Sequence, residues 1–180
     1  MVDRRAQDLL DVAEDKIREI SGPDYTLARD DAGLKLKDLP AGKEESSEVA
    51  GLKRLLTGLT FDKAFLADDA AVSGLTFGRP IRVALTDDSG YLLYHTVHED
   101  THYLKVEATF DMSKLEGITI GADDSEEQLK ANSALLTRRD EVNAFNDFHG
   151  SWVYELSSFT GKKFQLKLAD LIKAPPKDEN

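Results

Sequence analysis

Apolar and polar residues alternate through the middle of the chain, over residues 81–110. The alternation has a period of two, and two polar stretches at 87–90 and 99–101 interrupt it. Such a pattern predicts three consecutive antiparallel strands joined by two tight turns, a β-meander. We expect the rest of the chain to fold around this meander.

One register satisfies both predicted hairpins. Across the first turn it pairs Val83 with Tyr94, and across the second it pairs Tyr94 with Val106. A sheet covered on one side only should then carry its apolar residues on one face. Nine residues share that inward face: Ile81, Val83, Leu85, Leu92, Tyr94, Leu104, Val106, Ala108 and Phe110. Three charged residues share the opposite face: Arg82, Lys105 and Glu107.

Hydrophobic residues at helical spacing predict three helices that pack on this sheet. The first covers about 47–59, where Val49 and Leu52 begin an apolar stripe. The second covers about 125–148 and opens with the capping-box sequence Ser-Glu-Glu-Gln at Ser125. The third covers about 160–173, where Phe164 and Leu168 recur. The tail 174–180 is predicted to be disordered.

Shorter alternating runs predict further strands. We expect a helical turn near 7–12, followed by three strands that are separated by the turn signals Gly-Pro at 22–23 and Asp-Asp-Ala-Gly at 30–33. Single strands are expected near 61–68 and 152–156, and a short extended piece at 118–120. Because hairpin-linked strands pair antiparallel, the chain is predicted to be an α+β fold with one domain over 1–173. Two related βα halves, at about 6–78 and 79–173, are the alternative.

Composition narrows the range of functions. The chain carries 34 acidic and 23 basic residues, a net charge of −11, and has no block rich in lysine and arginine. Nucleic acid and anionic membrane surfaces should therefore be repelled. The absence of cysteine excludes disulfides, thiolate metal sites and cysteine nucleophiles. Apolar runs fall far short of the roughly 20 residues that cross a bilayer.

Four stretches together resemble a known family. Residues 146–173 contain the strand sequence Trp-Val-Tyr followed by a helix that ends in Leu-Ile. This stretch resembles the closing segment of the bacterial domain-of-unknown-function family 4340. Residues 9–44, 47–65 and 75–94 are similar to other parts of the same family. Ser151 separates the Gly-Trp pair found in many relatives, and Gly-Arg-Pro at 78–80 replaces a more usual Asp-Gly-Leu.

The resemblance implies a location and a kind of partner. Members look like proteins at the periplasmic face of the inner membrane, held by an N-terminal membrane helix that this chain lacks. They are often encoded beside ABC-type transporters of the gliding-motility class. The resemblance supplies no catalytic residue and no cofactor. We therefore expect a non-enzymatic extracytoplasmic interaction module, an accessory part of a membrane transport or envelope assembly with a protein partner.

A histidine-rich stretch at 95–102 is the strongest candidate for chemistry. In the predicted register His98 lies opposite His102 on one face, and His95 points to the other face. His98 and His102, completed by Glu99, by Asp100 or by a partner molecule, have the composition of a metal site. The alternative function is therefore a small-molecule or metal-binding protein that uses this hairpin tip. A solvated tip and a pH-sensitive histidine pair remain open as other interpretations.

Two further features have simpler interpretations. His149 at the end of the second helix is expected to interact favourably with the helix dipole. Trp152 and Tyr154 could line a ligand groove, but packing of their strand against a helix is the more common arrangement.

Overall fold

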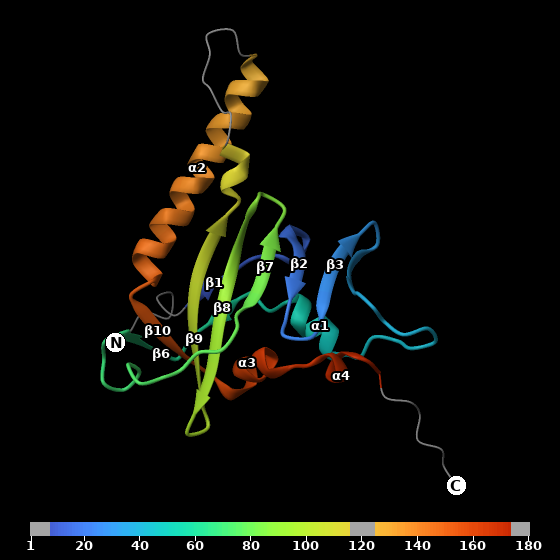
Figure 1. Ribbon diagram of the computed structural model, residues 1–180, viewed down its shortest axis with the longest axis vertical. Helices are drawn as coiled ribbons and strands as arrows, with labels where there is room; N and C mark the ends of the chain where they lie inside the picture. Colours follow the sequence, from blue (N-terminus) through green and yellow to red (C-terminus); the bar gives the residue numbers. More distant parts are fainter. Residues whose placement is uncertain (1–7, 116–124, 174–180) are drawn as a thin grey trace.

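The computed structural model describes residues 8–115 and 125–173, and it confirms an α+β fold built on antiparallel sheet (Figure 1). The large sheet has the strand order β4-β3-β2-β7-β8-β9-β10-β6. In that order its strands are Gly33–Leu36, Thr26–Asp30, Ile17–Ser21, Ile81–Leu85, Ser89–His98, Thr101–Phe110, Trp152–Leu156 and Lys63–Leu66. A small second sheet pairs β1 (Asp8–Leu10) with β5 (Leu59–Thr60).

Four α-helices and three 3-10 helices complete the part of the chain that the structure describes. The α-helices are α1 (Glu48–Lys53), α2 (Glu126–His149), α3 (Ser158–Lys162) and α4 (Leu168–Leu171). The 3-10 helices are η2 (Glu14–Lys16), η3 (Met112–Leu115) and η4 (Lys163–Gln165). In Figure 1, α2 runs past the end of the strands, and α3 and α4 lie toward the other end of the sheet.

The predicted meander β7-β8-β9 occupies the middle of the large sheet. β2 extends it on one side by pairing with β7, and β10 extends it on the other by pairing with β9. β6 then pairs with β10. The three strands expected between the first residues and α1 are present as β2, β3 and β4. Segments from both ends of the chain therefore enlarge the same sheet.

The predicted register of the first hairpin is wrong. The structure pairs Val83 with Tyr91, so β8 is shifted by three residues from the prediction. Gly90 belongs to the strand rather than to the turn. It lies so close to β7 that a side chain there would overlap the carbonyl oxygen of Val83, so this position of the strand requires glycine. The turn uses Asp88, which adopts a φ of 66°. Tyr91 and Leu93 therefore face the core, and Leu92 and Tyr94 do not.

The second hairpin differs from the prediction by one residue. Its turn contains only Glu99 and Asp100, with φ values of 51° and 63°. Two consecutive residues with positive φ are typical of a type I′ turn, which fits the right-handed twist of paired strands. This turn places His98 opposite Thr101 and Val97 opposite His102. The inward residues of β7 and β9 are those predicted, apart from the half-buried Phe110 at the end of β9.

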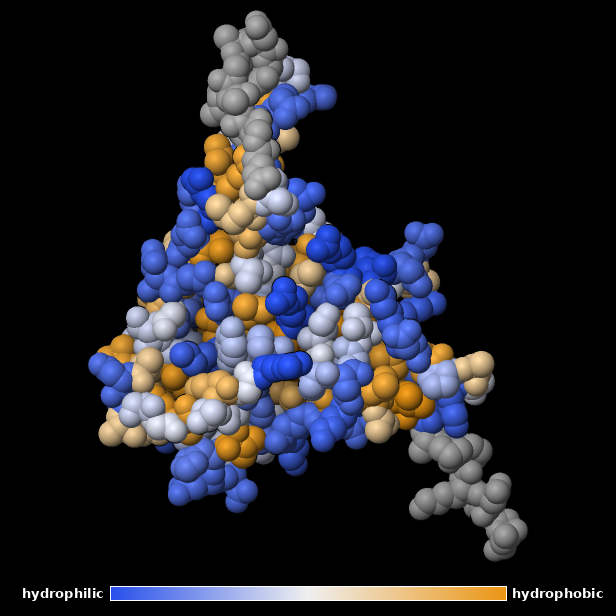
Figure 2. Space-filling view, viewed as in Figure 1, coloured by the Kyte–Doolittle hydropathy of each residue, from blue (hydrophilic) through white to orange (hydrophobic). Residues whose placement is uncertain are grey.

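The core lies between the inner face of the large sheet and the segments that cover it. Ile20, Val83, Leu93 and Leu104 are buried on the sheet. They share one hydrophobic cluster with residues of α1, of the turn that follows it, and of the C-terminal segment. The covering residues include Val49, Leu52, Leu56, Phe164 and Leu171. On the face shown in Figure 2, hydrophilic residues cover most of the surface.

The predicted helices are confirmed in part. Ser125 caps α2 by accepting a 3.1 Å hydrogen bond from the backbone N–H of Gln128, as the capping-box sequence indicates. The helix predicted over 47–59 stops at Lys53; Leu55 and Leu56 are buried in the turn that follows, and Leu59 is buried in β5. The helix predicted over 160–173 is broken into α3, η4 and α4. Near 7–12 the chain forms β1, not a helical turn. The extended piece predicted at 118–120 and the disordered tail predicted at 174–180 lie outside the described residues.

One side chain of α2 takes the place of a strand beside β9. Asn146 accepts a 2.7 Å hydrogen bond from the backbone N–H of Ala108 and donates a 2.8 Å hydrogen bond to its carbonyl oxygen. β10 pairs only with the opening part of β9, up to Leu104. The amide of Asn146 thus satisfies both backbone groups of Ala108, and it fixes α2 against the sheet.

Candidate functional site

The predicted metal-ligand set at the hairpin tip is not assembled. His98 is exposed, and its Nε2 lies 3.9 Å from Oε1 of Glu99. His102 is only 6% exposed and points into the core. The one-residue difference in register places the two histidines on opposite faces of the sheet. Within residues 8–115 and 125–173, no group of three or more histidine, cysteine, aspartate or glutamate side chains could hold a metal ion.

The histidine that contacts His102 is His95, which was predicted to point the other way. Nε2 of His95 lies 2.9 Å from Nδ1 of His102, a hydrogen bond in which one ring donates and the other accepts. The ring of Phe164 stacks on His95 with centroids 5.3 Å apart and an interplanar angle of 11°. Such a bond requires an unprotonated acceptor nitrogen, so it cannot form when both rings are protonated.

Burial keeps both histidines neutral. Burial, with the neighbouring His102 as a second cause, lowers the pKa of His95 from its ordinary value to about 4. Burial also lowers the pKa of His102, with the positive charge of Lys162 as a second cause. These directions follow from the cost of placing a charge where water is excluded. The pair therefore resists protonation.

α3 lies directly on the histidine pair because residue 161 is glycine. A Cβ atom at Gly161 would lie 2.5 Å from Cβ of His102, and closer still to its Cγ and Nδ1. Gly161 itself is buried. The absence of a side chain at this one position lets α3 approach the imidazole, and so it sets where Phe159 and Lys162 of the same helix are presented.

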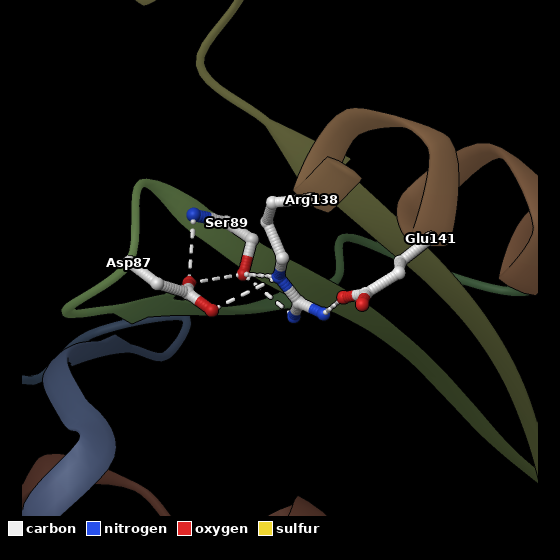
Figure 3. Close-up of polar contacts among 4 residues, drawn as sticks. All are labelled: Asp87, Ser89, Arg138 and Glu141. Carbon is white, nitrogen blue, oxygen red and sulfur yellow. Dashed lines mark hydrogen bonds and ion pairs between the residues drawn. The ribbon is translucent and has the colours of Figure 1, made fainter. Parts of the chain in front are cut away.

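A second polar cluster joins α2 to the first hairpin (Figure 3). Arg138 donates to Oγ of Ser89 from Nε and Nη2, at 3.0 and 2.8 Å. Its Nε also lies 2.9 Å from Oδ2 of Asp87, and its Nη1 lies 2.9 Å from Oε2 of Glu141. The hydroxyl of Ser89 in turn donates to Oδ1 of Asp87.

The contacts of Ser89 indicate a structural role for this cluster. Ser89 is buried. Its hydroxyl group donates a hydrogen bond to Asp87, and its oxygen accepts hydrogen bonds from Arg138. A serine nucleophile needs a neighbouring base that takes its proton and an approach for the substrate. Here the same groups hold the turn before β8 against α2. The cluster therefore orients the long helix on the sheet.

We expect Arg138→Gln to lower the free energy of unfolding by about 1 to 1.5 kcal/mol, because Ser89 and Asp87 lose their shared charged donor. The value stays small because the side chain of Arg138 is 25% exposed to solvent. Urea denaturation measures it. Arg139→Gln is the matched control, since Arg139 pairs only with the adjacent Asp140 among the described residues. Equal losses in the two variants would contradict the assigned role.

His149 and Tyr154 form a further pair at the end of α2. Nδ1 of His149 lies 2.5 Å from Oη of Tyr154, and the ring of Phe145 lies 4.2 Å from the ring of His149. Burial lowers the pKa of His149 and so favours its neutral form. His149 therefore does not supply the positive charge that was expected to interact with the helix dipole. Tyr154 is buried and Trp152 packs against the core, which confirms the packing interpretation for both.

A groove of about 590 Å³ lies between α1 and α3. We call it the α1–α3 groove. Its lining residues are Glu48, Ala50, Gly51, Arg54, Phe159, Lys162, Lys163 and Leu166. Phe159 is 77% exposed, the highest value among the large hydrophobic residues that the structure describes as exposed. Nζ of Lys163 lies 5.3 Å from the centre of its ring.

The groove concentrates positive charge on an acidic protein. It contains three cationic side chains and one carboxylate, that of Glu48, whereas the whole chain carries a net charge of −11. Arg54, Lys162 and Lys163 form no ion pair with a carboxylate in the described part of the chain.

Sequence reasoning missed this site, because α1 and α3 are more than a hundred residues apart in the sequence. The only local signal is an apolar residue, Phe159, just before the Gly-Lys-Lys sequence at 161–163.

Comparison with known proteins gives no relative: no family model, no curated protein and no solved structure matches the chain. The resemblance to family 4340 stays a prediction. No helix among residues 8–115 and 125–173 is both long enough and apolar enough to span a bilayer.

Proposed function

We propose that this protein is a non-enzymatic extracytoplasmic interaction module, an accessory part of a membrane transport or envelope assembly. The observation that carries the proposal is the α1–α3 groove. A phenylalanine that is 77% exposed lies there beside three cationic side chains. The resemblance to family 4340 contributes the location and the transport connection.

The residue types in the groove support a role in protein binding. Exposing a large aromatic ring to water costs free energy, which burial in a complex would recover. Aromatic residues and arginine are enriched at protein interfaces and dominate their binding energy. Phe159 and Arg54 meet this description, and Leu166 adds apolar area beside them.

The polar clusters elsewhere support the same assignment. Arg138 holds α2 on the first hairpin, Asn146 holds it on β9, and the His95–His102 pair supports α3. Each of these groups makes its hydrogen bonds to other parts of the same chain. These hydrogen bonds hold the surface elements in fixed positions, which a binding module requires.

The test is site-specific cross-linking in the organism that encodes the chain. The photo-reactive amino acid p-benzoylphenylalanine replaces Phe159 in the complete gene product. We expect irradiation to attach it to a protein that mass spectrometry identifies as part of a membrane transporter or of the cell envelope. The matched control places the same amino acid at Phe148, which is 65% exposed on α2.

Three results would count against the proposal. Equal cross-linking from positions 159 and 148, or none from position 159, would remove the groove as the binding surface. Protection from protease in cells with an opened outer membrane and an intact inner membrane would place the protein in the cytoplasm, and it would overturn the proposed location.

A further inference from the structure

Building on the proposed function, we infer that the α1–α3 groove binds a short acidic protein segment that also carries a large apolar side chain. The segment would place its carboxylates on Arg54, Lys162 and Lys163, and its apolar side chain against Phe159. The inference depends on the charge, the shape and the apolar surface of the groove, which are separate observations.

Charge complementarity selects an acidic partner. A local excess of cations on a chain of net charge −11 creates a positive patch within a negative field. Arg54 and Lys162 stand at the C-terminal ends of α1 and α3, where cations also favour the helix dipole. That effect does not account for the exposed Phe159 in the same groove. An acidic segment with an apolar side chain uses both features.

The shape of the groove selects a short segment. Its volume of about 590 Å³ has room for only a few side chains. Ala50 and Gly51 keep the α1 side open, and nothing lies within 4 Å of the position that a Cβ atom of Gly51 would occupy. A concave surface of this size favours an extended peptide over a flat lipid surface. Nucleic acid is disfavoured because a long polyanion would meet the negative charge of the rest of the chain.

The expected affinity is modest. A few carboxylate contacts on a partly exposed surface, with one apolar anchor, typically give a Kd of about 10 to 100 µM at low salt. The guanidinium of Arg54 can hold a carboxylate with two parallel hydrogen bonds, so it should contribute more than either lysine. Raising the salt concentration should weaken binding, because the charges are exposed.

The experiment measures fluorescence anisotropy of a fluorescein-labelled peptide of glutamate, aspartate and leucine with one central phenylalanine. The comparison peptide has glutamine and asparagine in place of the acids. We expect the acidic peptide to bind at least tenfold more tightly. Lys162→Glu combined with Lys163→Glu should weaken it at least tenfold. The matched control, Lys35→Glu with Lys130→Glu, makes the same charge change at exposed positions away from the groove.

A second variant tests occupancy without changing charge. Gly51→Leu would fill the open side of the groove, and a helical position with free space should accept leucine without loss of stability. We expect this variant also to weaken the acidic peptide at least tenfold. Thermal denaturation of each variant shows that it remains folded.

Several outcomes would overturn the inference. They are no binding of the acidic peptide, equal binding of the neutral peptide, and equal effects of groove and control substitutions. Groove-dependent dimerisation in sedimentation would show that a second copy of the chain is the occupant, and groove-dependent binding to phosphatidylglycerol vesicles would show a membrane surface.

Cross-linking from Phe159 does not depend on the charge of the partner. A positive cross-link with a negative peptide result would refute the acidic segment alone, and failure of cross-linking would refute the proposed function.

Discussion

Replacing Gly161 with alanine should lower the free energy of unfolding by about 2 to 3 kcal/mol, the upper part of the range for an overpacked core position. The new Cβ would overlap Cβ, Cγ and Nδ1 of His102. These atoms lie near the backbone of β9, so the imidazole cannot move aside without a change in rotamer and loss of its bond to His95. Urea denaturation followed by the fluorescence of Trp152, the only tryptophan in the chain, measures the loss.

Two comparisons make this prediction specific. Gly51→Ala places the same methyl group on α1, where nothing lies within 4 Å, and should be neutral or stabilising by up to about 1 kcal/mol. His102→Ala removes the obstructing ring, so Gly161→Ala should cost much less in that background than in the native one. If Gly161→Ala costs the same in both backgrounds, the contact with His102 is not the reason for glycine at this position.

Acidification should destabilise the protein through the His95–His102 pair. The folded pKa of His95 is about 4 and lies below its ordinary value of 6.5. The unfolded chain therefore binds protons first as the pH falls, so this stabilisation is present above pH 6.5 and is lost toward pH 4. A shift of this size would amount to roughly 3 kcal/mol without solvent screening, and we expect about 2 kcal/mol because His95 is only half-buried. Urea midpoints across this pH range measure the loss.

The pH effect has a matched pair of variants. His95→Gln keeps a hydrogen-bonding side chain against His102 but removes the titrating ring, so it should flatten the decline in stability between pH 6.5 and 4. His98→Gln removes an exposed histidine from the same hairpin and should retain the decline of the wild type. A decline that is unchanged in His95→Gln would mean that other groups produce it.

The meander shows what alternation can predict and where it stops. Alternation placed β7 and β9 with the correct faces inward, because their apolar residues follow one unbroken period. The two faces of β8 were predicted the wrong way round. Between Ser89 and Tyr94, both sets of alternate residues contain apolar side chains, Leu93 in one set and Leu92 with Tyr94 in the other, so the turn decides which set faces the core. That choice is made by contacts across the sheet, such as the close approach of Gly90 to Val83. Sequence periodicity does not contain this information.

The candidate sites depended on the same uncertainty. An inverted β8 sends His95 to the wrong face, so the pair that forms, His95 with His102, was not predicted. The α1–α3 groove depends on the end of the predicted third helix being broken into short pieces. It also requires residues of α1 and α3 to line one groove, and α3 is held on β9 by the buried contact between Gly161 and His102. Capping chemistry, by contrast, is local, and Ser125 was correctly assigned to the start of α2.

The amide of Asn146 on Ala108 has a consequence for the behaviour of the protein in concentrated solution. The N–H and C=O groups that Asn146 engages are those that a strand of a second molecule would need in order to add to β9. An exposed margin of this kind is a common starting point for aggregation, and here a helix side chain closes it. In addition to packing on the core, α2 therefore blocks a strand of a second molecule from pairing with β9 at Ala108.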